Sequence, residues 1–220
     1  MSNEEKYMNN ELLINARKPE GELGDKLINH MNKNHEGLAL WSLSHLDISK
    51  EDIILDIGCG GGVNVERFLK MTDNKVFGLD YSQLAVERSA KLNTDAIEEG
   101  RCNIIHGSVS NLPFEDESFD IVTAFETVYF WPDFANDLKE VWRVLKNNGV
   151  MFIANEAIPK DGDERQLELI ELLDMNLYSD EELHHYLKEA GFSVVDSFIK
   201  QSKDSFTGDD ADWICVIAKK

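Results

Sequence analysis

A run of glycines beside an acid, between positions 54 and 62, carries the clearest chemical signal in the chain. The stretch reads ILDIGCGGG, with Asp56 inside its apolar part and four glycines within the five positions 58–62. Glycine is needed where the backbone takes a positive φ angle or where a ligand approaches closer than a Cβ permits. Because a helical pattern follows at 63–70, the free N–H groups of a helix N-terminus add to this turn. The pattern predicts a strand, a tight turn and a helix that together bind a ligand.

The acids around this turn narrow the choice of ligand. A nicotinamide or flavin dinucleotide favours GxGxxG after the strand, and Gly58 and Gly60 supply its first half, but Val63 stands at the third glycine position. Asp80 ends the next apolar run, where a carboxylate can accept from the ribose hydroxyls of a nucleoside. The motif GxxxxGK[ST] is absent, which excludes a triphosphate cradle on motif grounds. A nucleoside-containing ligand is expected.

Other residues are candidates for contact with a second ligand. Tyr129, Phe130 and Trp131 follow an apolar run at 118–126, where the crevice beyond the strand ends should lie. They are predicted to contact a substrate, with packing under the next helix as the alternative. His35, Tyr129 and Glu156 are the candidate general bases. Cys59 has no base beside it in the sequence, so it is expected to be structural rather than nucleophilic.

A metal site is not expected. The histidines show no metal-ligand spacing. Acids cluster in two late stretches of the chain and suggest a metal-dependent, catechol-type enzyme as an alternative, but loop acids are usually just solvated. These acids are Asp161, Asp163, Asp209, Asp210 and Asp212.

Strand and helix patterns alternate through the middle of the chain. The expected strands are 53–58, 75–80, 103–108, 118–126 and 149–158, and the expected helices between them are 63–71, 82 to about 99, and 132–146. Strict alternation predicts a parallel sheet covered on both faces. Two further strands, 192–200 and 212–220, follow each other with only a loop between them and should pair antiparallel. The fold expected is an α/β, Rossmann-like three-layer sandwich with a seven-stranded, mostly parallel sheet and an antiparallel last strand.

The N-terminal part has a different pattern. Apolar residues recur at helical spacing from Glu22 to Leu46, with a break near Gly37. We expect residues 1–46 to form a helical extension or lid of the same domain, and residues 47–220 to form the main body. Part of this extension is a candidate cover for the ligand site.

Composition limits the classes of partner. The 220 residues hold 42 acids against 22 Lys and Arg, a formal net charge of −20. Such a surface repels phosphate backbones and anionic lipid, so nucleic-acid and membrane partners are disfavoured. The three cysteines are scattered and lack CxxC spacing, which favours reduced thiols. With no signal-peptide pattern and no long apolar run, a cytoplasmic protein is expected.

Three segments together resemble a known family. DIGCGGG with Asp80, GSVSNLPFEDESFDIV at 107–122 and LKEVWRVLKNNGVMFI at 138–153 resemble a class I S-adenosylmethionine-dependent methyltransferase, in the broad branch that includes quinone-biosynthesis-type enzymes. The resemblance implies S-adenosylmethionine as cofactor and methyl transfer to a small-molecule acceptor by in-line displacement. It says nothing of the acceptor atom.

The resemblance also assigns cofactor-binding positions. Gly58 to Gly62 would pass under the cofactor, Asp56 would order that loop, Asp80 would accept the ribose hydroxyls, and Tyr81 would lie beside the adenine. Ser108 departs from the family, which usually has an Asp there, so its bond to the adenine amine should be weaker. The full set is Asp56, Gly58, Cys59, Gly60, Gly62, Asp80, Tyr81, Ser82, Ser108, Val109, Glu126 and Thr127.

Two other functions stay open at this point. One is an NAD(P)-dependent oxidoreductase on a Rossmann-like scaffold, against which Val63 argues. The other is a non-catalytic, S-adenosylmethionine-binding regulatory protein, against which the intact glycine loop and Asp80 argue. A monomer or a homodimer is expected.

Overall fold

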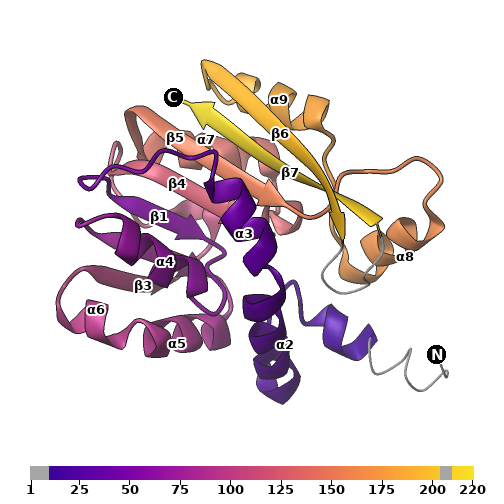
Figure 1. Cartoon of the computed structure of the whole chain (residues 1–220), viewed down its shortest axis with the longest axis horizontal. Coiled ribbons are helices and arrows are strands. Elements are labelled where there is room, and N and C mark those ends of the chain that lie inside the picture. The colour runs from indigo at the N-terminus through magenta and orange to yellow at the C-terminus, as the bar shows by residue number, and fades with distance from the viewer. Residues whose placement is uncertain (1–9, 204–209) are drawn as a thin grey trace.

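Seven strands form one sheet in the order β3-β2-β1-β4-β5-β7-β6 in the computed structural model, which describes residues 10–203 and 210–220 (Figure 1). The strands are β1 Ile54–Ile57, β2 Val76–Asp80, β3 Cys102–His106, β4 Phe119–Phe125, β5 Leu145–Asn155, β6 Val194–Lys203 and β7 Asp210–Lys219. Strands β1 to β5 pair parallel, and β7 pairs antiparallel with both β5 and β6. The expected seven-stranded sheet with an antiparallel last strand is confirmed.

Helices cover both faces of this sheet. They are α2 Gly21–Asn34, α3 Glu36–Leu43, α4 Val63–Met71, α5 Gln83–Leu92, α6 Thr94–Glu98, α7 Phe134–Val144, α8 Glu164–Leu173 and α9 Asp180–Glu189, with 3-10 turns η1 Val109–Asn111 and η2 Val128–Phe130. In Figure 1, α3 and α4 lie in front of the sheet and α7 behind it. The three-layer sandwich is therefore confirmed.

A hydrophobic core lies on each face of the sheet, between the strands and the helices that cover that face. There are two cores because successive side chains of a strand point to opposite faces. In β1, Leu55 and Ile57 pack in one core with α7 and α9. Ile54 packs in the other core, with Phe68 of α4 and Leu38 of α3. Asp56 is thereby turned toward the same side of the sheet as α3 and α4, at the strand end.

The strand order fixes where a ligand can bind. After β1 the chain builds outward through β2 and β3, then returns to place β4 on the other side of β1. The loops that leave the carboxyl ends of β1 and β4 consequently diverge, and such a switch point leaves a crevice in open α/β sheets. The glycine loop at 58–62 and the segment 126–131 border that crevice.

Several element boundaries differ from the sequence-based expectation, and the strand expected at 149–158 is β5, which already begins at Leu145 and ends at Asn155. The helix expected from 82 to about 99 is two helices, because the side-chain amide of Asn93 donates to the carbonyl of Ser89 at 2.9 Å and interrupts the run. Helix α7 ends at Val144, not at 146, because its last carbonyls accept from the N–H groups of Glu117 and Ser118. The break between α2 and α3 is at His35, two residues before Gly37.

The N-terminal extension is packed on the body of the domain. Helix α3 contacts β5 and β7, and α2 contacts α5, where Arg88 pairs with Asp25 at 3.3 Å. Before α2, residues 10–14 are helical, and the side-chain hydroxyl of Ser82 donates to the carbonyl of Pro19 at 2.6 Å. These contacts hold residues 10–46 beside the carboxyl ends of the strands.

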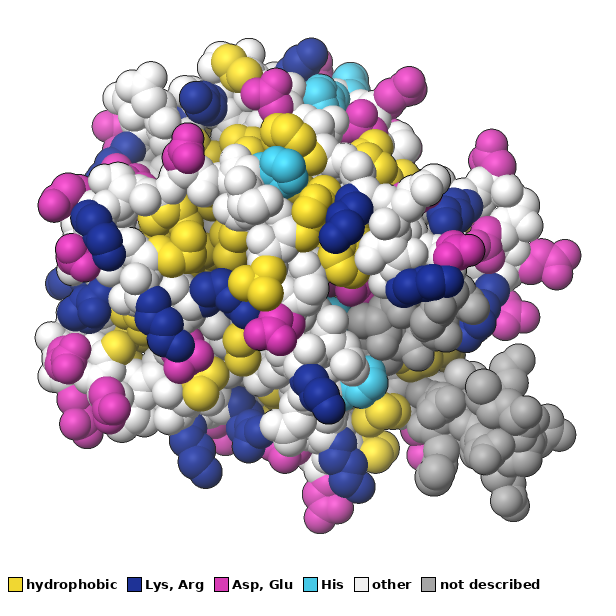
Figure 2. Space-filling view, in the orientation of Figure 1, with side chains coloured by type: hydrophobic (Ala, Val, Ile, Leu, Met, Phe, Trp, Pro, Cys, Tyr) yellow, Lys and Arg dark blue, Asp and Glu magenta, His cyan; other side chains and the backbone are white. Residues whose placement is uncertain are grey.

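The distribution of surface charge and the length of the helices relate to the expectation that nucleic-acid and membrane partners are disfavoured. On the face shown in Figure 2, Lys and Arg side chains are dispersed among acidic ones and do not gather into one patch. Within residues 10–203 and 210–220, no helix has the length and apolar character needed to cross a membrane.

Candidate active site

The glycine loop takes a backbone path that other residues resist. Gly58, Gly60 and Gly62 have φ angles of 70°, 50° and 83°, and the N–H of Gly58 donates to the carbonyl of Leu79 at 2.7 Å. A Cβ added at Gly58 would lie 2.8 Å from the Cβ of Thr127, so the loop passes against the segment after β4. At Gly60 a Cβ would meet no atom within 4 Å, because this residue faces open space. The loop therefore presents bare backbone to a cavity.

Asp80 at the end of β2 is tied to this loop. Its two carboxylate oxygens accept from the N–H of Gly60 at 2.9 Å and from the N–H of Ser82 at 2.8 Å. Burial raises the pKa of Asp80, while these two N–H donors act in the opposite direction. Each carboxylate oxygen has a second lone pair, so the group can still accept from a diol.

Asp56 is the second acid of the site. It is 2% exposed, and the hydroxyl of Thr123 donates to its Oδ1 at 2.7 Å. Burial is the main cause that raises the pKa of Asp56 from its ordinary value of 3.8 to about 7. Near neutral pH this carboxyl is thus close to half-protonated.

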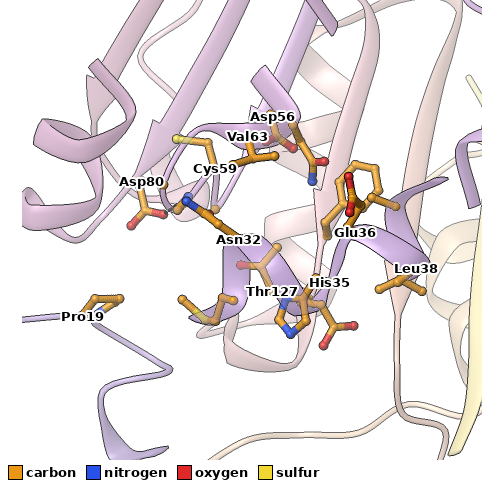
Figure 3. Close-up of a pocket in the computed structure, with 18 of the residues that line it drawn as sticks. Pro19, Asn32, His35, Glu36, Leu38, Asp56, Cys59, Val63, Asp80 and Thr127 are labelled. Atoms are coloured by element: carbon orange, nitrogen blue, oxygen red, sulfur yellow. Dashed lines mark hydrogen bonds between the residues drawn. The ribbon is translucent and has the colours of Figure 1, made fainter. Parts of the chain in front are cut away.

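Both acids line a cavity that we call the central cavity. Its sheet side is the glycine loop with Asp56, Asp80 and Thr127, and its opposite side comes from the N-terminal extension, including Asn32 and His35 (Figure 3). Cys59 lines it as well; burial raises the pKa of its thiol, and no described cysteine forms a disulfide. Since a thiol, not a thiolate, faces the cavity, the expectation of a structural Cys59 gains support.

A second space, the side cavity, continues from the central cavity past Asp80. It is lined by Ser108, Val109, Tyr81 and Trp131. The two cavities share Gly58, Asp80, Tyr81 and Thr127. A ligand that spans both would be long, with its middle at Asp80.

A third space, the apolar cavity, opens from the other end of the central cavity. Its polar groups are His35, Glu126, Tyr129 and Glu156. The apolar walls are Leu13, Ala16, Met31, Phe130, Ala157, Leu169, Leu173, Met175 and Leu177. The central and apolar cavities share Ala16, Met31, His35 and Glu126. A mostly apolar lining with a few polar groups suits a small organic molecule.

The polar groups of the apolar cavity come from three distant segments. One donor atom from each of His35, Glu126 and Glu156 lies within 4.8 Å of the others, and this is the group of described residues whose donors are close enough to hold a metal ion. Glu126 accepts from the hydroxyl of Tyr129 at 2.9 Å and from the N–H of Glu156. Its φ of 55° is a left-handed conformation, which costs a non-glycine residue about 1–2 kcal/mol. All three candidate bases therefore meet in one place.

Most residues that the sequence singled out line these cavities; Gly62 and Ser82 line none of the three, and Trp131 lines a different cavity from Tyr129. Gly62 lies at the N-cap of α4, where a Cβ would collide with Ser89. Ser82 is fully buried and caps α5, accepting from the N–H of Ala85. Trp131 is 4% exposed and lines the side cavity, away from the apolar cavity that Tyr129 and Phe130 line.

The loop acids proposed for the alternative metal site are otherwise engaged. Asp163 caps α8, Asp212 lies 3.8 Å from Lys160, and Asp210 pairs with Lys203 at 2.5 Å. Asp161 is exposed, and Asp209 lies outside the described residues.

Sequence reasoning missed several residues of the central cavity. Arg67 follows from α4, one turn after the glycine loop, and helix periodicity could have found it. Met31, Asn32 and Glu36 come from the N-terminal extension, whose amphipathic pattern does not say which part of the sheet it covers.

Comparisons with known proteins agree with this geometry. Residues 55–153 match the family described as "Methyltransferase domain". The chain is 31% identical over 183 residues to cycloartenol-C-24-methyltransferase of Arabidopsis thaliana, covering 78% of this chain and 52% of the relative. It is 25% identical over 191 residues to the uncharacterized methyltransferase YdaC of Bacillus subtilis, covering 86% of this chain and 95% of that protein. The chain spans 35% to 52% of the length of the first curated relatives that it matches.

A solved structure shows the same architecture. Phosphoethanolamine N-methyltransferase 2 of Haemonchus contortus, in complex with S-adenosyl-L-methionine, superposes with a TM-score of 0.76 at 16% identity, covering 89% of this chain and 57% of that one. At this identity the likeness establishes the fold alone.

The fold and the cavities define the class: a Rossmann-like domain with a glycine loop and a buried acid, Asp80, at the switch point of its sheet. The chain carries a methyltransferase domain of the class I S-adenosylmethionine-dependent type, as the resemblance predicted. S-adenosylmethionine is the cofactor of this class.

Proposed function

We propose that the protein transfers the methyl group of S-adenosylmethionine to a small molecule bound in the apolar cavity. The observation that carries the proposal is Asp80, fixed by the N–H groups of Gly60 and Ser82 at the border of two connected cavities. A nucleoside with its ribose at Asp80 has room for its base in the side cavity and for a chain in the central cavity. That chain then ends where the apolar cavity begins.

The residues present fit this cofactor. Gly60 leaves bare backbone facing the central cavity, as a close-lying ligand requires. Asp80 accepts the ribose hydroxyls, Ser108 and Val109 lie against the adenine, and Asp56 and Glu126 face the methionine end. When bound, the cofactor supplies a methyl group already activated on a sulfonium, so the protein needs only to align the acceptor and exclude water. Positioning of this kind accounts for about 7–11 kcal/mol of a barrier.

A small-molecule acceptor is supported by the shape and lining of the apolar cavity. Its leucine and methionine walls suit an organic body, and its polar groups are concentrated where it meets the central cavity. The Arabidopsis relative is named for transfer to cycloartenol, itself a small molecule.

Ligand-dependent stability tests the cofactor. S-Adenosylhomocysteine at 100 times its Kd should stabilise the fold by about 2.7 kcal/mol, and Asp80→Ala should abolish most of this effect. Asp47→Ala removes an equally charged but exposed side chain away from the cavities and is the matched control. If the protein shows no stabilisation by either S-adenosyl compound, the proposal fails.

Two controls separate the alternatives. Stabilisation by NAD(H) or NADP(H), and not by S-adenosylhomocysteine, would support the oxidoreductase. Binding of S-adenosylmethionine without methyl transfer to any member of a broad screen of amines, thiols, phenols and carbon acids would support the regulatory protein.

A further inference from the structure

The polar end of the apolar cavity has a definite electrical character. Glu126 and Glu156 lie there with His35, and neither lysine nor arginine is among the described residues that line this cavity. Glu156 is 3% exposed, so its carboxylate has little contact with solvent. Two carboxylates this close repel each other, and a positively charged group placed near both lowers the repulsion. The site therefore favours a positively charged group.

The aromatic residues of the cavity favour the same charge. Tyr129 and Phe130 both line it, with ring centroids 4.7 Å apart in an edge-to-face arrangement. Aromatic faces attract ammonium groups, and they do so more strongly where water is excluded. This preference is independent of the carboxylates.

On these grounds we infer that the apolar cavity binds an amine acceptor, a primary or secondary amine on an apolar body, whose nitrogen is held by Glu126, Glu156 and His35. The inference rests on the proposed function. The three donor atoms lie within 4.8 Å of one another. A tetrahedral nitrogen with acceptors at about 2.8 Å requires them about 4.6 Å apart, within this limit. A metal ion would use the same three donor atoms, but it would make no contact with the apolar walls, whereas the body of an amine would pack against them.

The position of the three side chains suits the reaction. His35 and Glu126 line both the central and the apolar cavity, so a nitrogen between them lies at the junction where a methyl group must pass. The apolar walls then hold the body of the amine on the far side of its nitrogen.

In the proposed reaction a proton leaves the amine before the methyl group is transferred. The bound ammonium gives one proton to the imidazole of His35, which frees the lone pair of the nitrogen. This lone pair forms the new N–C bond to the methyl carbon while the C–S bond breaks and its electron pair stays on sulfur. The products are the methylated ammonium and S-adenosylhomocysteine, and the imidazolium returns its proton to solvent. Since the proton moves between two groups that face the same carboxylates, those carboxylates stabilise the charge before and after the transfer.

A binding experiment isolates the recognition step. Melting temperatures are measured with saturating S-adenosylhomocysteine and a series of probes: hexylamine, 2-phenylethylamine and tryptamine, each against the alcohol of the same body. We expect the amines to raise the melting temperature and the alcohols not to. Glu156→Gln should raise the Kd of the amines about tenfold or more and leave the Kd of S-adenosylhomocysteine nearly unchanged. Glu171→Gln, which removes one exposed charge on α8, should behave like the wild type.

Methyl transfer is the second readout. With S-adenosylmethionine, product should form on the amines and not on the alcohols or on 2-phenylethanethiol, and Glu156→Gln should lower kcat/KM. His35→Asn serves as the second variant if Glu156→Gln does not fold, because His35 lies at a helix junction and not in the sheet.

The outcomes are distinct. Equal binding of amines and alcohols, transfer to alcohol or thiol in preference to amine, or amine binding unchanged in both variants would each overturn the inference. So would Mn²⁺ binding to the EDTA-treated protein that Glu156→Gln abolishes, with no binding of the amines. A protein that binds S-adenosylhomocysteine and none of the amines refutes this inference alone, whereas one that does not bind S-adenosylhomocysteine refutes the proposed function as well.

Discussion

Replacement of Asp56 by asparagine should make the stability of the protein less dependent on pH. Burial raises the pKa of this carboxyl from its ordinary value of 3.8 to about 7, so the folded state binds a proton that the unfolded state has lost between these values. The free energy of unfolding therefore rises as the pH falls through 7, by about 1.4 kcal/mol per pH unit, and the gain ends near the ordinary pKa. The full contribution is about 4 kcal/mol. Above pH 7 the folded state carries the cost of a buried, ionised carboxylate.

Asparagine keeps the shape of the side chain and an oxygen that can accept from Thr123, but it does not titrate. Relative to the wild type, Asp56→Asn should therefore gain about 2 kcal/mol of stability when the pH is raised from 5.5 to 8.5. Acids that do not interact with Asp56 affect both proteins alike and cancel in the difference, whereas the charge of Asp80 helps to raise the pKa of Asp56 and is part of the effect.

Urea unfolding followed by tryptophan fluorescence measures this difference. Trp131 and Trp213 are 4% and 8% exposed, so their emission changes on unfolding. Melts at half-unit steps between pH 5.5 and 8.5, with equal m values for the two proteins, give the free energies. A stability difference that is the same at every pH would show that Asp56 is ionised in the folded state, and the reasoning from burial would be wrong. The same variant should bind S-adenosylhomocysteine more weakly at pH 8, since Asp56 faces the central cavity.

Three further changes test parts of the framework. Gly62→Ala should lower the midpoint of urea unfolding by the equivalent of about 1–3 kcal/mol, because its φ of 83° and its contact with Ser89 both exclude a Cβ; an unchanged midpoint would contradict this. Leu138→Ala, in the fully buried face of α7, should lose about 2–5 kcal/mol in the same assay, and a loss below 1 kcal/mol would mean that the core collapses into the space. Ser179→Ala removes the capping box with Glu182 and should cost about 0.5–2 kcal/mol in the same urea assay; no loss would show that α9 is held by packing alone.

The sequence predicted most of the fold because its signals are local. Apolar runs mark the strands, the glycines at 58–62 mark the turn after the first of them, and strict alternation of strand and helix requires parallel pairing. Where a long-range contact decides a boundary, the expectation was wrong: at the end of α5 the amide of Asn93 donates to the carbonyl of Gly62 as well as to that of Ser89, and α7 ends where the N–H groups of Glu117 and Ser118 donate to its last carbonyls. No local pattern reveals such partners.

The part of the candidate site that is proposed to bind the cofactor could also be predicted from local sequence signals. Gly58, Gly60 and Asp80 lie at the ends of adjacent strands. A turn that needs positive φ angles favours glycine, so it can be recognised in the sequence. The assignment of each residue to the cofactor remains a prediction that the variants above address.

The sequence by itself determined the class of domain, the glycine loop and the acid at Asp80, because strand ends in a parallel sheet meet at one edge and their residue types are visible in order. Only the tertiary structure decided that His35, Glu126 and Glu156, 91 and 30 positions apart along the chain, share one cavity wall, that Trp131 lies in a different cavity from Tyr129, and that the N-terminal extension forms the opposite side. These facts depend on how a helical segment of no distinctive pattern packs across the sheet, and packing is set by the whole surface that the segment meets.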